Sequence, residues 1–196
     1  MALSRRWQAG GPVETRLAQK CAGRCLHAPL RLDLSVAECD DATAFPDFNA
    51  FFTRALREDA RPLAASDWCQ PADGVLSQRG DIEAASLIQA KGRRYRVDEL
   101  LAGSADEAHR YRNGCFATTY LSPRDYHRVH MPISGRLVKT RYVSGDLFSV
   151  NAATVQRVEG LLARNERLVC FFETDHGGVV VAVSYTHLTL PTNREV

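Results

Sequence analysis

Two histidines lie close together in a stretch rich in side chains that can do chemistry. Residues 118–132, with the sequence TTYLSPRDYHRVHMP, contain His127 and His130 three positions apart. A serine that suits an N-cap and a proline that suits the first helical position predict a helix of about two turns over Ser122–Met131. On such a helix the two imidazoles would face the same side, where they could transfer protons near neutral pH.

The pair of histidines also fits simpler roles. Beside Asp125 and Arg128, they can be solvated surface residues with no chemical task. A metal site is a third interpretation, although no further cluster of ligands accompanies the two rings in the sequence. The spacing alone leaves proton transfer, a surface pair and a metal site open.

An aspartate in a predicted turn is the second candidate. Asp73 stands in the sequence QPADGVLS, residues 70–77, and Asp-Gly before an apolar stretch is first of all a turn signal. A carboxylate at a turn can also orient a histidine and stabilise its protonated form, as in a catalytic triad. The spacing identifies no nucleophile, because several serines are near in sequence: Ser77, Ser122, Ser134, Ser144 and Ser149.

Short strands must position these candidates. From about residue 70 onward, short apolar stretches alternate with Gly and Asp. They predict strands at 74–78, 86–90, 115–121, 136–143, 167–173 and 178–183. Short helices are expected at 98–102 and 153–162. The expected fold class is α+β, mainly antiparallel β-strands with short helices and an N-terminal helical segment.

Two helices are expected ahead of the strands. Over residues 48–57, the side chains of Phe48, Phe51, Phe52 and Leu56 share one helical face, and Pro62 prevents the helix from running on. Residues 14–26 form a basic amphipathic pattern, with Arg16, Lys20 and Arg24 recurring every four residues. Such a helix can lie on an anionic membrane surface or be an ordinary surface helix with a solvated basic face.

Composition bounds the class of protein. The chain has 196 residues, 45% hydrophobic and 24% charged, which is ordinary for one soluble globular domain. A net charge of +2 is too small to indicate a nucleic-acid partner. The apolar runs are too short for a transmembrane helix, and no signal peptide is visible. Six cysteines without an export signal fit a reducing compartment, and we expect an intracellular domain.

Several motifs follow one another along the chain in a recognisable order. They are FFTRALR, PADGVLS, IQAKG, RNG, the run over residues 118–132, GDLFSVN and ARNER. From roughly Phe45 to Val181, this order resembles phosphatidylserine decarboxylase of the bacterial type.

The resemblance implies a chemistry for the candidate residues. Members of the family are proenzymes that cut themselves before a serine and convert it to a pyruvoyl group, the pyruvate cofactor. This group forms a Schiff base with phosphatidylserine, which becomes phosphatidylethanolamine and CO2. By the same resemblance, Asp73 and His130 match the acid and base that activate the serine. His127 matches the histidine of decarboxylation, Tyr120 lines the substrate pocket, and no residue is expected to hold a metal.

The resemblance also implies partners and a location. The partners are phosphatidylserine in membranes and an α-chain that carries the pyruvoyl group, with no nucleic acid, and assembly into a homo-oligomer stays open. The expected location is the cytoplasmic side of the cell membrane, as a peripheral protein. The alternative function is a non-catalytic peripheral lipid-binding module that uses the basic helix over residues 14–26.

The sequence departs from the family pattern at both ends. The family's serine lies in a Leu-Gly-Ser-Thr type motif, which does not occur here, and the Gly103–Ser104 pair precedes the histidines. We therefore expect the chain as written neither to cleave itself nor to decarboxylate the lipid. The expected organisation is a divergent segment at 1–44, an incomplete decarboxylase domain at 45–183 and a foreign tail at 184–196.

Overall fold

The computed structural model describes residues 33–83, 86–90 and 93–184, so the basic helix expected at 14–26 lies outside the described residues. The chain forms two compact units. The first contains the described residues up to Ala64 together with Pro123–Arg128. The second contains Ala65–Ser122 and the described residues from Val129 onward.

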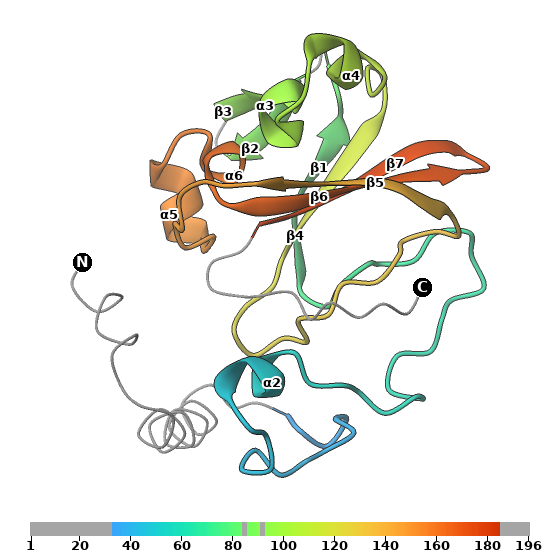
Figure 1. Ribbon diagram of the computed structural model, residues 1–196, viewed down its shortest axis with the longest axis vertical. Helices are drawn as coiled ribbons and strands as arrows, with labels where there is room; N and C mark the ends of the chain where they lie inside the picture. The colour runs from blue at the N-terminus through green and yellow to red at the C-terminus, as the bar shows by residue number, and fades with distance from the viewer. Residues whose placement is uncertain (1–32, 84–85, 91–92, 185–196) are drawn as a thin grey trace. The chain divides into compact units, whose positions relative to one another are not determined.

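The second unit is built from antiparallel strands (Figure 1). β1 (Val75–Asp81) pairs with β4 (Cys115–Tyr120), and β2 (Ser86–Ala90) pairs with β3 (Arg93–Arg96). A three-stranded sheet has the order β5-β6-β7, formed by Arg136–Val143, Arg167–Thr174 and Gly177–Ser184. The predicted α+β class with mainly antiparallel strands is confirmed for the described residues.

Four short helices accompany these strands: α3 (Val97–Leu101), α4 (Ala105–His109), α5 (Ala152–Arg157) and α6 (Leu161–Arg164). The helix expected at 153–162 is two helices, because the backbone at Val158 is extended and ends α5. The Ser104 side chain accepts a hydrogen bond from the Glu107 backbone N–H at 3.1 Å and so caps α4, which was not predicted.

The core of this unit lies between α3, α4 and the middle of β6. Along β6, Arg167, Val169 and Phe171 are buried and the residues between them are half-buried, as alternation along a strand requires. They pack with Tyr95 and Leu101 in one apolar cluster. Burial raises the pKa of Tyr95 to about 12, so its hydroxyl stays protonated inside the fold.

The first unit is small and contains one short helix, α2 (Phe48–Phe52). The Asp47 side chain caps it by accepting a hydrogen bond from the Ala50 N–H at 2.8 Å. The Phe51 side chain is buried with Leu34. The helix predicted to continue through Leu56 ends at Phe52 instead, because Leu56 forms a β-bridge with Ala37.

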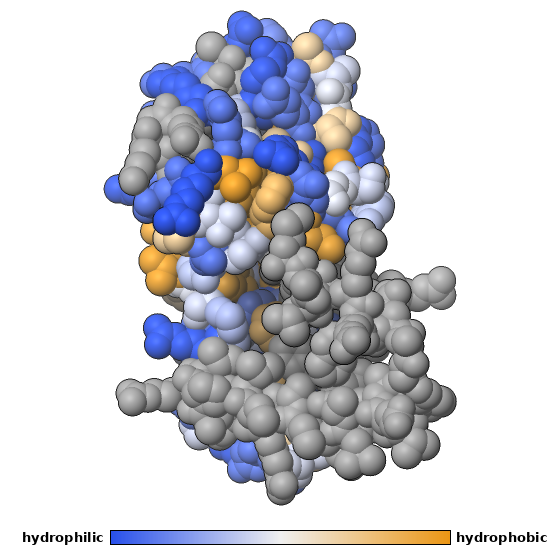
Figure 2. All heavy atoms as spheres, turned by 90° about the vertical axis from the view of Figure 1, so that its left-hand side faces the viewer, coloured by the Kyte–Doolittle hydropathy of each residue, from blue (hydrophilic) through white to orange (hydrophobic). Residues whose placement is uncertain are grey.

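The surface is mixed in polarity. On the face seen in Figure 2, hydrophobic side chains show as patches between hydrophilic ones. Exposed large apolar side chains occur on two strands, Val75 and Leu76 on β1 and Leu137 and Val138 on β5. None of the helices among the described residues combines the length and apolar character that crossing a bilayer requires.

Candidate functional site

The segment that carries both histidines is not helical. After a turn at Pro123, the chain is neither helix nor strand up to Met131, so the helix predicted over Ser122–Met131 is wrong. A helix would pair the His130 N–H with the carbonyl of Tyr126. The His130 N–H instead donates to the carbonyl of Pro71 at 2.7 Å. A long-range hydrogen bond has replaced the local one, and the two histidines do not share a helix face.

The same hydrogen bond ties the segment of the candidate acid to that of the candidate base. The Cys69 N–H donates to the Pro132 carbonyl at 2.8 Å, so two backbone bonds join the segments in antiparallel order. Asp73 lies two residues beyond Pro71, whose carbonyl holds His130. Two residues span at most about 7 Å, so the backbone of Asp73 lies within about 7 Å of the residue that anchors His130 in the second unit. Asp73 is half-buried and His130 is exposed.

Tyr120 belongs to the same group. It is the last residue of β4 and pairs with Val75, the first residue of β1. Gly74 between Asp73 and Val75 has φ +122°, and a Cβ there would lie under 3.0 Å from the carbonyl oxygen of Tyr120. The chain can therefore cross the end of β4 only with a glycine, and this crossing sets Asp73 beside Tyr120.

His127 lies in the first unit, where its ring packs on Phe52. The ring centroids are 3.8 Å apart, and Nδ1 lies 2.7 Å from the Asp125 carbonyl oxygen. Desolvation lowers the pKa of His127 and the charge of Arg54 adds to this, against an opposing effect of Asp125. The ring is therefore neutral at pH 7. With Nδ1–H donating to the carbonyl, Nε2 carries the lone pair that can accept a proton.

The segments 145–151 and 163–167 dock on each other. Asn165, which is fully buried, donates from Nδ2 to the Phe148 carbonyl at 2.7 Å and accepts from the Phe148 N–H at 3.0 Å. The Asp146 N–H donates to the Arg164 carbonyl at 2.9 Å, and the two side chains form an ion pair at 3.0 Å. The contacts of residues 145–151 and 163–167 are thus those of a packed connection.

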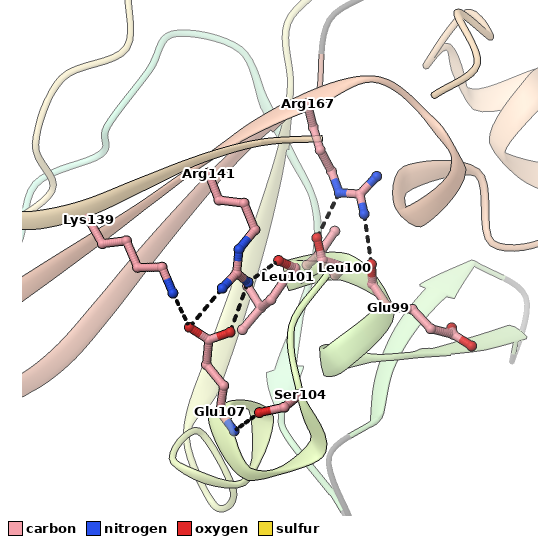
Figure 3. A network of polar contacts seen from close by, with 8 residues as sticks. All are labelled: Glu99, Leu100, Leu101, Ser104, Glu107, Lys139, Arg141 and Arg167. Carbon is pink, nitrogen blue, oxygen red and sulfur yellow. Dashed lines mark hydrogen bonds and ion pairs between the residues drawn. The ribbon is translucent and has the colours of Figure 1, made fainter. Parts of the chain in front are cut away.

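A buried arginine holds this connection to the helices (Figure 3). The guanidinium of Arg167, which is 2% exposed, donates to four backbone carbonyls, and Figure 3 draws the bonds to Glu99 and Leu100. The acceptors are Glu99, Leu100, Ala163 and Asn165, at 2.6–2.8 Å. Cations are favoured at helix C-termini, and the first three acceptors lie in α3 and α6. In the sequence this residue is only the last of the ARNER motif, and nothing in its spacing indicates burial.

An ion-pair cluster attaches α4 to β5. The Glu107 carboxylate binds Lys139 at 2.9 Å and Arg141 at 2.8 Å (Figure 3). These bonds, that of Arg141 first, hold the pKa of Glu107 below its usual value. Arg141 also donates to the Leu101 carbonyl at 2.6 Å, and both cations lie over the Phe171 ring. The charges satisfy one another, which is typical of a structural cluster.

The described residues hold no group of three or more His, Cys, Asp or Glu side chains that could bind a metal ion. The candidate residues therefore fall into two groups, one in each unit. Asp73, Tyr120 and His130 lie on connected segments of the second unit, and His127 packs on Phe52 in the first unit. The second unit thus holds a carboxyl and an imidazole on joined segments, and the first holds an imidazole whose lowered pKa favours its neutral form.

Comparison with known proteins gives consistent matches. The family model described as phosphatidylserine decarboxylase matches residues 48–188. The chain is 50% identical over 183 residues to a phosphatidylserine decarboxylase proenzyme of Delftia acidovorans, covering 90% of this chain and 64% of the relative. It is 59% identical over 153 residues to a protein of the same name from Alcanivorax borkumensis, covering 76% of this chain and 53% of the relative. The chain thus spans between about half and two thirds of the length of these relatives.

Proposed function

The chain belongs to the phosphatidylserine decarboxylase family, and we propose that it forms the part of a self-processing proenzyme that converts phosphatidylserine to phosphatidylethanolamine and CO2. The observation that carries the proposal is the pair of backbone hydrogen bonds between residues 69–71 and 130–132. These bonds tie the segment that carries the Asp73 carboxylate to the segment that carries the His130 imidazole, which supports a joint role for the two side chains.

Asp73 and His130 serve self-cleavage in this proposal. A serine hydroxyl becomes a nucleophile when a neighbouring base takes its proton. The exposed His130 ring can receive a serine hydroxyl, and the Asp73 carboxylate orients the ring and stabilises it once it is protonated. We assign the serine to none of the described residues. Tyr120 lines the same pocket and contacts the substrate.

His127 serves the decarboxylation step. The pyruvoyl group of the mature enzyme supplies an electrophilic carbonyl that acts as an electron sink when CO2 leaves. A carbon that has lost CO2 must gain a proton. Because the pKa of His127 is lowered, its protonated form is a stronger acid than an ordinary imidazolium, and a proton that Nε2 takes up from water passes readily to that carbon.

The proposed substrate also sets the location. Phosphatidylserine lies in a bilayer, so the protein must meet a membrane surface, and we place it there as a peripheral protein on the cytoplasmic side. The proposed decarboxylase body is residues 45–183, with a segment that contacts the membrane at 1–44 and a separate tail at 184–196. In the mature enzyme its partner is the α-chain that bears the pyruvoyl group.

Expression of the complete open reading frame that encodes this chain tests the proposal. Self-cleavage is followed on gels, and CO2 release is measured with labelled phosphatidylserine in mixed vesicles. Asp73→Asn and His130→Ala should prevent or greatly slow cleavage. His127→Ala should leave cleavage intact and lower CO2 release by roughly 100-fold or more.

The control is His109→Ala, which removes an exposed histidine of α4. It should change neither reaction. Cleavage at the normal rate in both Asp73→Asn and His130→Ala would show that these residues are not the activating pair. Normal CO2 release by His127→Ala would remove that residue from the proposed mechanism.

A further inference from the structure

We propose that Gln70 and Thr119 are positioning residues for Asp73, acting through one hydrogen bond between their side chains. This inference rests on the proposed function, because it takes Asp73 as the carboxylate that orients the base. The Gln70 amide Nε2 donates to the Thr119 hydroxyl oxygen at 2.8 Å. Forty-nine positions separate the two residues along the chain, so the bond connects two distant segments.

The hydrogen bond between Gln70 and Thr119 adds a further attachment to the segment that carries Asp73. The backbone of this segment is tied to residues 130–132 by the two bonds at Cys69 and Pro71. Gln70 lies between those two anchors, and its side chain reaches β4 instead. The segment between Cys69 and Gly74 is therefore held by His130 and its neighbours and by β4 at the same time.

The attachment points on β4 are adjacent residues. Gln70 binds Thr119, and Gly74 passes directly over the carbonyl of Tyr120. Asp73 stands between these two fixed points, so its backbone has little freedom to move away from the anchor of His130. Losing the link at Gln70 removes one of the attachments that fix the segment carrying Asp73.

The loss of such a bond has a small effect on folding stability and a large effect on the rate of a reaction that depends on the position of Asp73. The bond is exposed and joins two neutral groups, so it contributes little to stability. A misplacement of about 1 Å can slow a reaction by about 100-fold. A purely structural role would change melting temperature and cleavage rate together, whereas a positioning role changes the rate and leaves the melting temperature nearly the same.

The experiment measures self-cleavage rates in the protein expressed from the complete open reading frame. Thr119→Val keeps the β-branched shape and removes the hydroxyl, and Gln70→Ala removes the other partner. Each should slow cleavage by roughly 10-fold. The double variant should be no slower than either single variant, because both break the same bond. Thr119→Ser restores a hydroxyl and should restore the rate.

A matched control comes from the same pair of strands. The Ser77 hydroxyl donates to the Thr118 carbonyl at 3.0 Å and also links β1 to β4, so Ser77→Ala removes a similar exposed bond. It should leave the rate unchanged. Asp73→Asn is measured alongside to test the proposed function on its own.

The outcomes separate the two proposals. Normal cleavage by Thr119→Val together with slow cleavage by Asp73→Asn would overturn the positioning role and leave the proposed function in place. Equal slowing by Ser77→Ala and Thr119→Val would also overturn it, because the cause would then be a weaker strand pair. Normal cleavage by Asp73→Asn would overturn the role of Asp73 in the proposed function, on which this inference rests.

Discussion

Replacing Gly74 with alanine should destabilise the second unit and disturb the site at the same position. Two separate features of the structure oppose a side chain here. The φ of +122° lies in a region that residues with a Cβ rarely adopt. A Cβ would also lie under 3.0 Å from the Tyr120 carbonyl oxygen and 3.3 Å from the Leu121 Cα, and these atoms are backbone that cannot rotate away.

The size of the effect follows from these two features. Backbone strain at a position of this kind costs about 1–3 kcal/mol. Relief of the contact requires movement of the first β1–β4 pair, Val75 with Tyr120, at the cost of about one hydrogen bond, or ~1 kcal/mol. Alanine restricts the unfolded chain and returns about 0.4–1 kcal/mol. Gly74→Ala should therefore lower the free energy of unfolding by about 1–4 kcal/mol.

Alanine variants at two other glycines measure the backbone strain and the close contact separately. Gly177 has φ +105° and open space around its Cβ position, so Gly177→Ala should cost about 1–2 kcal/mol from strain alone. A Cβ at Gly145 would lie under 3.0 Å from the Arg164 carbonyl oxygen without a positive φ, so Gly145→Ala measures the contact alone.

The assay is equilibrium unfolding in urea, followed by circular dichroism, with self-cleavage measured in parallel. Gly74→Ala should be less stable than Gly177→Ala and should cleave more slowly. Equal stability of these two variants would refute the argument, because it would show that the approach to Tyr120 has no energetic consequence. Full stability with slow cleavage would place the effect at Asp73 and not in the strand pair.

Three further predictions concern buried and charged groups. Because folding lowers the pKa of His127, the unfolded chain binds more protons than the folded one, and stability should fall as pH drops through about 6.5 and below. Phe52→Ala should raise the pKa of His127 in an NMR titration. An unchanged pKa would contradict the argument that packing on Phe52 desolvates the ring. Arg167→Met leaves four backbone carbonyls, one buried and three part-buried, without this donor and should cost about 3–5 kcal/mol in urea unfolding, against less than 1 kcal/mol for the exposed Arg157→Met. The pKa of Glu107 is lowered in the folded state, so its contribution to stability is present above about pH 4.5 and is lost as pH falls below that value. Glu107→Gln should lower the free energy of unfolding by about 1–2 kcal/mol at pH 7 and should have no effect near pH 2. An equal loss at both pH values would refute the stabilising role of the Glu107 charge.

The local part of the fold could be predicted from the sequence. Strands β1, β5, β6 and β7 lie within a few residues of their predicted ranges, because apolar stretches bounded by Gly and Asp are a local signal. β3 was missed because residues 93–96 are three arginines and a tyrosine, without apolar alternation. It forms because Tyr95 enters the core and pairs with Leu87 of β2. No local pattern specifies such a pairing.

The helix predicted over Ser122–Met131 failed for a related reason. Its N-cap serine and first-turn proline are correct local signals, but they are weak beside tertiary hydrogen bonds. The His130 N–H bonds to Pro71 and the Arg128 guanidinium donates to the Thr53 carbonyl at 2.8 Å, and each of these partners is distant in sequence. Spacing within one segment cannot report contacts with another.

This failure changes how the two histidines are understood. Three positions apart on a helix, they would have formed one site with one task. Without the helix, the His130 backbone is held by Pro71, two residues before Asp73, in the second unit, and His127 packs on Phe52 in the first. The tasks proposed for them divide in the same way, since activation of a serine is proposed for His130 together with Asp73. Proton transfer to a substrate carbon needs an imidazole that gives up its proton readily, and the burial that lowers the pKa of His127 makes its protonated form a stronger acid. The environments of His127 and His130 thus support two different roles, whereas the spacing of the two residues alone would have suggested one shared role.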